Sequence, residues 1–404
     1  MMRVSTELCV GAAERVRLCL KDLFHHDVVE MIERETRKYS LWDVTSSSDP
    51  LFDGCWELLW EGFGAAGEVE RREVIAASAD ADPFVPTKDG TFHRYFLLAA
   101  RDRDGRLLGV RDGSILVNPA YDPSLCVIYL AHIYMRPEAR GSVLSYWLRI
   151  APVELATQYL KDLHSRGLFK LPAPDQPGRY FGMRMNLAAE MEYYTPDERQ
   201  SWQRILFYGR GGFDAINPRH FPYRQPDFRD PAVIRETGNR PVPFMVLLRR
   251  MGRERQATLP IAEAQAVMNL LYDDFAEHCS EEHLQNSLEV VMDRLERRAR
   301  RENFVELLPL PTGPRDIHRF KRLFRYSVFK NYYGDAPDTR DYLQGPIAAR
   351  LKANRRYLEE SLAEIAQELE GRPHWVYGNR QQGFSWEGHP IPETPSDGDE
   401  GQQP

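Results

Sequence analysis

Three strand-like runs follow one another at residues 93–100, 107–117 and 126–135. The first two are joined by Arg103-Asp104-Gly105-Arg106, whose Asp-Gly pair is a strong signal for a tight hairpin. Strands that follow one another after such short connections pair in antiparallel fashion. We therefore expect an antiparallel meander of three strands at the centre of the fold.

The pattern changes after the meander to a long helix, predicted at residues 142–164, which Gly167 and the Pro-rich residues 171–178 end. A strand at 180–192, a helix at 196–210 and a strand at 243–250 follow. This alternation does not repeat as regular strand-helix-strand units. It indicates an α+β fold rather than a doubly wound parallel sheet.

A short strand at 40–44 and a helix at 51–63 precede the meander, and an acidic stretch, Glu68, Glu70 and Glu73, opens a second short helix. Together these elements predict a mixed, mostly antiparallel central sheet flanked by helices. Beyond residue 253 the periodicity is mostly helical, and the last residues are dense in Pro, Gly, Asp and Glu. The predicted parts are an N-terminal helical segment (1–39), the main domain (40–253), a helical C-terminal extension (254–387) and a disordered tail (388–404).

Composition restricts the class of protein. The 404 residues are 42% hydrophobic and 28% charged, and no apolar run approaches the ~20 residues of a membrane span. Residues 1–20 lack the apolar core of a secretory signal, so we expect a cytoplasmic protein. The five cysteines are scattered without C-x-x-C spacing, which favours free thiols and no metal. The net charge of -7 makes nucleic acid an unlikely partner.

The stretch Ile133-Tyr134-Met135-Arg136-Pro137-Glu138-Ala139-Arg140-Gly141-Ser142 joins the third strand of the meander to the long helix. A strand that feeds a glycine-containing turn at a helix N-terminus exposes backbone N–H groups beside the positive end of the helix dipole. This arrangement predicts a pyrophosphate site.

A second signal is Phe207-Tyr208-Gly209-Arg210-Gly211-Gly212-Phe213, a Tyr near a helix end followed by a glycine turn. With the first segment it resembles the GNAT acetyltransferase superfamily, which carries V-x-P-x-x-R-G-x-G-x-G/A and, later, L-Y-x-x-x-G-F. The resemblance covers roughly half the chain. The sequence departs from the pattern at Val143, where the family has glycine, and at Ser145, where it has glycine or alanine. The Val143 side chain stands where phosphate normally meets bare backbone.

The resemblance implies an acyl-CoA-dependent N-acyltransferase, most simply an N-acetyltransferase, in which an amine attacks the thioester directly. Acetyl-CoA or another acyl-CoA is the co-substrate, held in a gap between the fourth and fifth strands. The residues implied to bind it are Ile133, Tyr134 and Met135 through backbone groups, and the turn residues Arg140, Gly141, Ser142, Val143, Leu144 and Ser145.

The reaction needs an acid for the leaving thiolate and a base for the amine. The resemblance assigns the acid to Tyr208. The base stays open among His132 on the fourth strand and Glu190 and Glu192, which share a face of the fifth.

The acceptor implied is an amine-bearing small molecule or peptide. Acidic residues of the first two helices would attract it if they face inward: Asp53, Glu57, Glu61, Glu68, Glu70 and Glu73. Two alternatives remain: a GNAT-fold interaction protein with weak or no catalysis, and an acyltransferase that uses a long-chain or carrier-protein donor. The extension is a candidate for a homodimer contact.

Overall fold

The computed structural model describes residues 6–7, 38–64, 68–140, 142, 144–174, 181–195, 199–227, 229, 231–254, 256–276, 279, 281–311 and 324–333. Its strands form one sheet in the order β1-β2-β3-β4-β5-β6-β9-β7-β11-β10, and β8 pairs with β9. The strands are β1 (Thr6–Glu7), β2 (Tyr39–Asp43), β3 (Phe92–Asp102), β4 (Leu107–Val117), β5 (Leu125–Met135), β6 (Arg184–Glu192), β7 (Asp214–Ile216), β8 (Arg224–Gln225), β9 (Val242–Arg250), β10 (Thr258–Pro260) and β11 (Phe304–Pro309).

The predicted meander is confirmed, because β3, β4 and β5 pair in antiparallel order. Among the described strands β5 and β6 make the parallel pair, and the remaining pairs are antiparallel. The helices are α3 (Phe52–Phe63), α4 (Arg72–Asp80), η3 (Pro137–Ala139), α5 (Leu144–Ser165), α6 (Arg199–Arg210), α7 (Pro231–Thr237), α8 (Ile261–Ala276), α9 (Glu281–Ala299), α11 (Tyr326–Phe329) and η4 (Lys330–Tyr332). The mixed, mostly antiparallel sheet flanked by helices is therefore as predicted.

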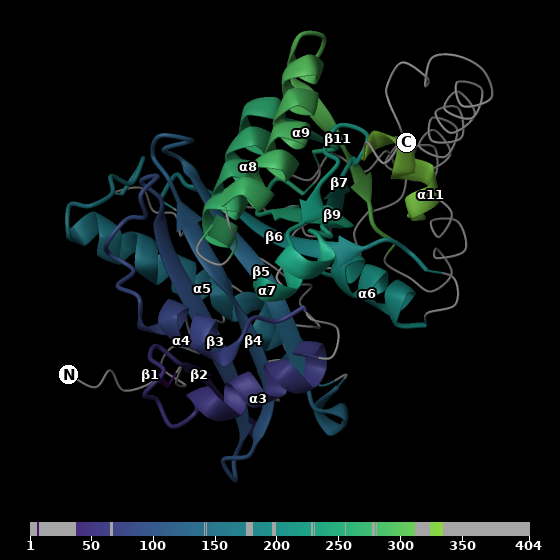
Figure 1. The fold of residues 1–404 in the computed structure, drawn as a ribbon. Coiled ribbons are helices and arrows are strands. Elements are labelled where there is room, and N and C mark those ends of the chain that lie inside the picture. The colour runs from purple at the N-terminus through teal and green to yellow at the C-terminus, as the bar shows by residue number, and fades with distance from the viewer. Residues whose placement is uncertain are drawn as a thin grey trace, which may run out of the picture.

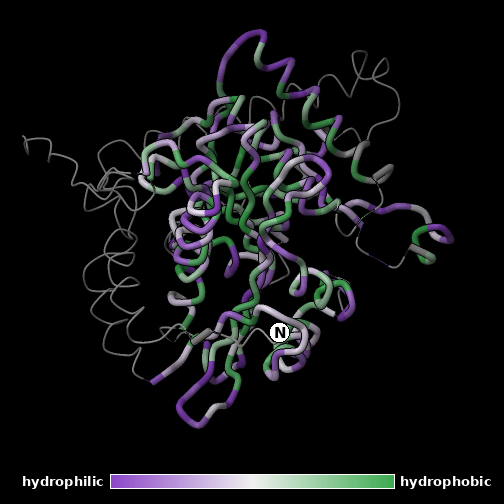
Figure 2. The backbone as a smooth tube through the Cα atoms, turned by 90° about the vertical axis from the view of Figure 1, so that its left-hand side faces the viewer, coloured by the Kyte–Doolittle hydropathy of each residue, from purple (hydrophilic) through white to green (hydrophobic). Residues whose placement is uncertain are grey.

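The helices cover both faces of the sheet. Alternate residues of a strand point to opposite faces, and Ile128 packs into the core cluster beneath α5 while Val127 packs against α8. A third cluster joins α3 and α4 to the sheet on the α8 side. Figure 1 shows α3 and α4 at one end of the sheet and α8 and α9 at the other. Hydrophobic stretches follow the central strands in Figure 2, and hydrophilic ones follow many outer loops.

The extension is not purely helical. Residues 304–309, which lie beyond the predicted domain boundary at 253, form β11 and pair with β7 in the main sheet. The short β7 thereby gains a second neighbour for its backbone groups, a need that helical periodicity does not reveal. Within residues 324–333, the last described part of the extension, the helical structure is limited to α11 and η4.

Most of the predicted N-terminal segment (1–39), residues 334–387 of the predicted extension and the predicted tail 388–404 lie outside the described residues. Residues 6–7, inside the segment predicted to be helical, form the strand β1. Within the described part of the chain, none of the helices combines the length and apolar character needed to cross a bilayer.

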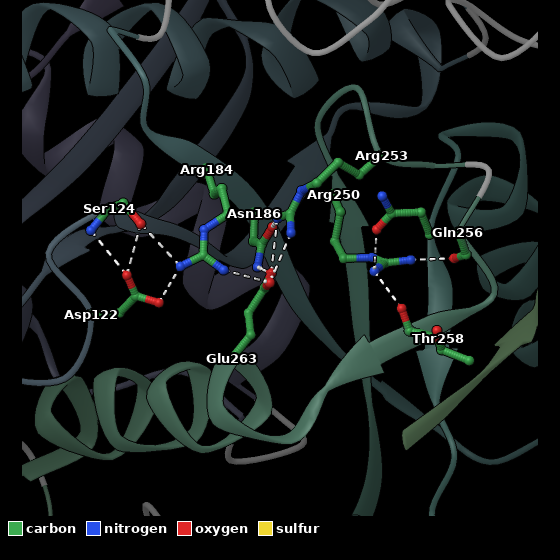
Figure 3. A network of polar contacts seen from close by, with 9 residues as sticks. All are labelled: Asp122, Ser124, Arg184, Asn186, Arg250, Arg253, Gln256, Thr258 and Glu263. Atoms are coloured by element: carbon green, nitrogen blue, oxygen red, sulfur yellow. Dashed lines mark hydrogen bonds and ion pairs between the residues drawn. The ribbon is translucent and has the colours of Figure 1, made fainter. Parts of the chain in front are cut away.

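One end of the β5–β6 pair is clamped by polar contacts (Figure 3). The Glu263 carboxylate of α8 accepts hydrogen bonds from Arg184 (3.0 Å), from Asn186 (2.7 Å) and from both terminal nitrogens of Arg253 (2.8 and 2.9 Å). Arg184 also donates to Ser124 Oγ at 3.0 Å and pairs with Asp122. Residues 125–129 of β5 and 184–188 of β6, here called the clamped end, are thus held together and against α8.

Candidate active site

The strands β5 and β6 separate beyond the clamped end. Their parallel pairing runs from Leu125 and Arg184 to Tyr129 and Ala188. Beyond it, β5 keeps its partner β4 as far as Met135, and β6 keeps β9 as far as Glu192. We call residues 130–135 and 189–192 the open end. Successive backbone N–H and C=O groups of a strand point alternately toward its two neighbouring strands. The groups of residues 130–135 that point toward β6 therefore have no strand partner among the described residues.

A bulge in β5 shapes the open end. Arg111 pairs with Ile133 and Gly113 with Leu130, so that Asp112 alone lies opposite Ala131 and His132. Gly113 has φ +153°, and a Cβ there would lie 2.0 Å from the Tyr129 carbonyl oxygen. Asp112 Oδ1 accepts the His132 backbone N–H at 2.8 Å. The bulge therefore aims the side chains of Asp112 and His132 at one another.

A pocket opens beside this bulge between α4 and α8. Four of its lining residues are carboxylates, and among the described residues that line it there is neither lysine nor arginine. The lining residues are Glu68, Glu70, Val74, Ile75, Ser78, Tyr95, Asp112, Gly113, Ser114, Tyr129, Ala131, His132, Gln225, Asp274 and Phe275. Such a wall attracts cations.

His132 is a cation in this wall. Its Nδ1 lies 3.1 Å from Asp112 Oδ1, and its Nε2 lies 2.8 Å from the Glu68 carbonyl oxygen. Burial alone would lower the pKa of His132, but the Asp112 carboxylate, with Glu70 and the Glu68 carbonyl, raises it to about 9. Both ring nitrogens are then donors at neutral pH.

Glu190 lies behind the pocket wall. Its carboxyl accepts hydrogen bonds from the Tyr129 hydroxyl at 2.8 Å and from Gln225 Nε2 at 3.1 Å, and it also contacts the Tyr223 hydroxyl. Burial raises the pKa of Glu190 to about 7, although these hydrogen bonds and the charge of His132 act in the opposite direction. A carboxyl with a pKa near neutrality can both take and release a proton.

Glu192, the other carboxyl of β6, is already paired. It forms an ion pair with Arg204 of α6, and its side chain is one-third exposed. Of the acidic helix residues, Glu68 and Glu70 line the pocket, whereas Asp53, Glu57 and Glu73 are exposed. Glu61 accepts a hydrogen bond from the Tyr134 hydroxyl at 2.6 Å.

Tyr208 of α6 belongs to the core cluster on the α5 side of the sheet, across the open end from the pocket. Its ring meets Phe213 edge-on at 5.3 Å between centroids. Burial raises the pKa of Tyr208, while the positive charges of Arg111, Arg149 and Arg204 lower it and Glu192 raises it. The hydroxyl is therefore protonated at neutral pH and has cations around it.

The turn before α5 is partly described, because Gly141 and Val143 lie outside the described residues. Arg140 N–H donates to the Pro137 carbonyl, Ser142 N–H to that of Ala139 and Ser145 N–H to that of Ser142, at 3.2–3.3 Å. The Leu144 amide approaches Ser142 Oγ at 3.4 Å. These amides bond within the turn, so the described part of the predicted pyrophosphate site is engaged.

The sequence did not single out six of the residues that line the pocket: Tyr95, Asp112, Ser114, Tyr129, Gln225 and Asp274. They come from β3, β4, β5, β8 and α8, and only the fold brings them together. One signal was readable: Arg111-Asp112 places two charges inside an otherwise apolar strand, and buried charges need partners. Among the described residues no group of three or more His, Cys, Asp or Glu has the arrangement of a metal site.

Comparison with known proteins returns neither a matching family model nor a matching curated protein. Among solved structures, the phosphinothricin acetyltransferase of the GNAT superfamily from Sinorhizobium meliloti, in complex with AcCoA, is 16% identical, with a TM-score of 0.30 over 54% of this chain and 90% of that one. A variant of the spermidine N-acetyltransferase SpeG from Vibrio cholerae is 8% identical, with a TM-score of 0.25 over 55% and 98%.

Nourseothricin acetyltransferase is 16% identical, with a TM-score of 0.20 over 39% of this chain and 65% of that one. These solved structures are acetyltransferases by their names. At these identities and TM-scores the likeness carries no argument about this chain. What the site does has to be argued from its own residues.

Proposed function

We propose that this protein is an acyl-CoA-dependent N-acyltransferase whose amine acceptor binds in the acidic pocket. The observation that carries the proposal is the open end, where a pocket walled by four carboxylates borders a separation of two parallel strands. Glu190, whose pKa is about 7, touches that pocket through Tyr129 and Gln225. The proposal rests on this geometry and the two sequence motifs, not on the substrates that the similar structures are named for.

The pocket suits a cationic amine. A lysine-like amine has a pKa of ~10.4 and arrives protonated at neutral pH. Glu68, Glu70, Asp112 and Asp274 give it a negative wall, although Asp112 is partly neutralised by His132 and Asp274 pairs with His93 at 3.0 Å. The acceptor class is an amino group on a small molecule or a peptide.

The base we assign is Glu190. The ammonium must lose a proton before its nitrogen can attack, and a carboxylate with a pKa near 7 is matched to that task. The Tyr129 hydroxyl lines the pocket and donates to Glu190, so it can relay the proton. His132 is not suited, because a histidine that stays protonated to about pH 9 has no free nitrogen to accept a proton.

The acid we assign is Tyr208. The amine nitrogen forms a bond to the thioester carbonyl carbon, and the carbon–sulfur bond breaks. Glu190 takes the ammonium proton before the attack and later releases it to solvent. The nitrogen loses its second proton to solvent as the amide forms, Tyr208 gives its own proton to the leaving thiolate, and solvent restores the phenol. Unpaired backbone N–H groups of 130–135 that face the separation are placed to polarise the thioester oxygen. The balance is ammonium plus acyl-CoA to amide, free CoA and one proton released to solvent.

The test is amide formation by the purified full chain. Acetyl-CoA and a panel of small amines and peptides are incubated with it, and thiol release and product mass are recorded. Glu190→Gln should lower kcat by roughly 10²–10⁴-fold. Glu192→Gln is the matched control on the same strand face and should retain most activity, because Glu192 is already paired with Arg204. Equal losses in both variants would remove Glu190 from the role of base.

A second candidate follows from the turn before α5. Its described amides bond within the turn and leave fewer donors for a pyrophosphate. A donor that lacks the nucleotide, such as a carrier-protein thioester, would depend less on this turn. If acyl-CoA gives no product with any amine while a carrier-bound acyl group does, this candidate replaces the first.

A further inference from the structure

Arg111 is a buried cation that is short of hydrogen-bond acceptors. It lies in the middle of β4, is 1% exposed, and none of its three guanidinium nitrogens makes a hydrogen bond of ordinary geometry to the described residues. The neighbouring Asp112 carboxylate accepts from His132 and Tyr95 instead. Burial lowers the pKa of Arg111, whereas the Asp112 charge and the Tyr208 hydroxyl, which makes a loose hydrogen-bonding approach to the guanidinium, raise it. A buried charge left in this state is costly.

Arg250 of β9 shows what a satisfied arginine of similar burial looks like. It is 2% exposed, and its guanidinium donates to the Thr258 carbonyl at 2.7 Å, to Gln256 Oε1 at 3.4 Å and to the Gln256 carbonyl (Figure 3). The same fold therefore supplies three acceptors to one buried guanidinium and, among the described residues, only the loosely placed Tyr208 hydroxyl to the other. The missing acceptor at Arg111 points to a group that comes from outside the chain.

The surroundings of Arg111 favour an anion. Arg149 of α5 is 6% exposed, and its guanidinium carbon lies 4.0 Å from the centroid of the Phe207 ring. Both arginines lower the pKa of Tyr208, which places both charges near its hydroxyl. Glu192, the carboxylate that also influences Tyr208, is engaged by Arg204. The α5 side of the open end is therefore positive, whereas the pocket across the sheet is negative.

We propose that Arg111 binds a carboxylate at the far end of the transferred acyl group, so that the preferred donor is a dicarboxylic acyl thioester such as succinyl-CoA. This inference rests on the proposed function. If Tyr208 protonates the leaving thiolate, the sulfur lies against its hydroxyl and the acyl group begins one atom further on. Arg111 lies beside the same hydroxyl, within the reach of a short acyl chain. A planar guanidinium accommodates a carboxylate through two parallel N–H···O bonds.

The test compares donors that differ in that carboxylate alone. Succinyl and butyryl groups have the same number of carbons, so the wild-type chain should show a kcat/KM for succinyl-CoA at least roughly 10-fold above that for butyryl-CoA, because the neutral chain leaves Arg111 unpaired. Arg111→Met should abolish or reverse the preference. Arg250→Met, at a guanidinium already satisfied, should keep it. The wild-type comparison stands even if a variant does not fold.

Three results would overturn the inference. Butyryl-CoA used as well as succinyl-CoA by the wild type would show that no carboxylate is bound. Equal losses for both donors in Arg111→Met would assign Arg111 to Tyr208 or to the phosphates of CoA. Calorimetric titration does not depend on catalysis. Equal affinities of the wild type for the two donors, left unchanged in Arg111→Met, would also overturn the inference. Failure to acylate any amine from any donor, with acetyl-CoA included, contradicts the proposed function itself and is distinguishable from these.

Discussion

The two ends of the β5–β6 pair treat buried charge in opposite ways. At the clamped end, Glu263 binds Arg184, Asn186 and Arg253, so every charge there has a partner in the chain (Figure 3). At the open end, the Arg111 guanidinium has only the Tyr208 hydroxyl loosely beside it, and burial raises the pKa of Glu190 to about 7. The paired charges of the clamped end hold strands together. We propose that Arg111 and Glu190 of the open end instead serve a substrate and a proton.

The largest effect should come from Tyr208→Phe at the open end. Loss of the general acid is expected to lower kcat by roughly 10²–10⁴-fold while donor affinity stays near that of the wild type. Steady-state kinetics and calorimetric titration check the two parts. Tyr159→Phe is the matched control, because the Tyr159 hydroxyl is also buried but binds the Pro83 carbonyl. Unchanged turnover in Tyr208→Phe would remove this residue from the mechanism.

Glu263→Ala should act on stability instead. It leaves Arg184 and Arg253 without their shared carboxylate, and removal of one partner of a buried pair costs about 3–5 kcal/mol. Denaturant unfolding measures the loss. The kcat of the folded variant should stay close to that of the wild type, since the clamped end makes no contact with the reacting groups. A large fall in kcat without a loss of stability would break the division between the two ends.

His132→Gln gives a smaller and pH-dependent loss of stability. The rise of the His132 pKa from its ordinary 6.5 to about 9 means that the folded protein prefers the protonated ring, worth roughly 3 kcal/mol. That contribution is fully present below pH 6.5 and is lost as the pH rises through 9. Unfolding at pH 6 and pH 9.5 should therefore show a large difference between wild type and variant at the lower pH. A difference that grows with pH would show that His132 is neutral in the folded state.

The smallest effect is the pH profile of the wild type. Glu190 is a neutral acid below its pKa of about 7 and cannot accept a proton, so kcat/KM should fall about tenfold per pH unit below 7 and level off above it. Glu190→Gln should lose this inflection. A wild-type profile that is flat between pH 5 and 8 would contradict the assignment of the base.

Much of the architecture could be read from the sequence because its strands and helices carry clear periodicity. The meander of β3, β4 and β5 and the long α5 follow from it directly. β11 could not be predicted, since its pairing depends on where β7 lies in space. The boundary predicted near residue 253 did not anticipate this pairing, which joins residues 304–309 to the main sheet.

The site was only partly accessible from the sequence. Glu190 and His132 were candidates because their places on the strands follow from local pattern, and Tyr208 was a candidate because the GNAT resemblance implies its role. Their roles depend on neighbours from distant segments, such as Gln225 beside Glu190 and Asp112 beside His132. Gly141 and Val143 lie outside the described residues, so their roles stay predictions.

The most direct test of the central claim is calorimetric titration of the purified chain with succinyl-CoA, acetyl-CoA and a long-chain acyl-CoA. We expect saturable binding in the micromolar range for at least one of them, with an affinity unchanged in Glu263→Gln and with succinyl-CoA weakened in Arg111→Met. If none of the three CoA thioesters binds, the proposal that the open end holds an acyl-CoA donor is wrong.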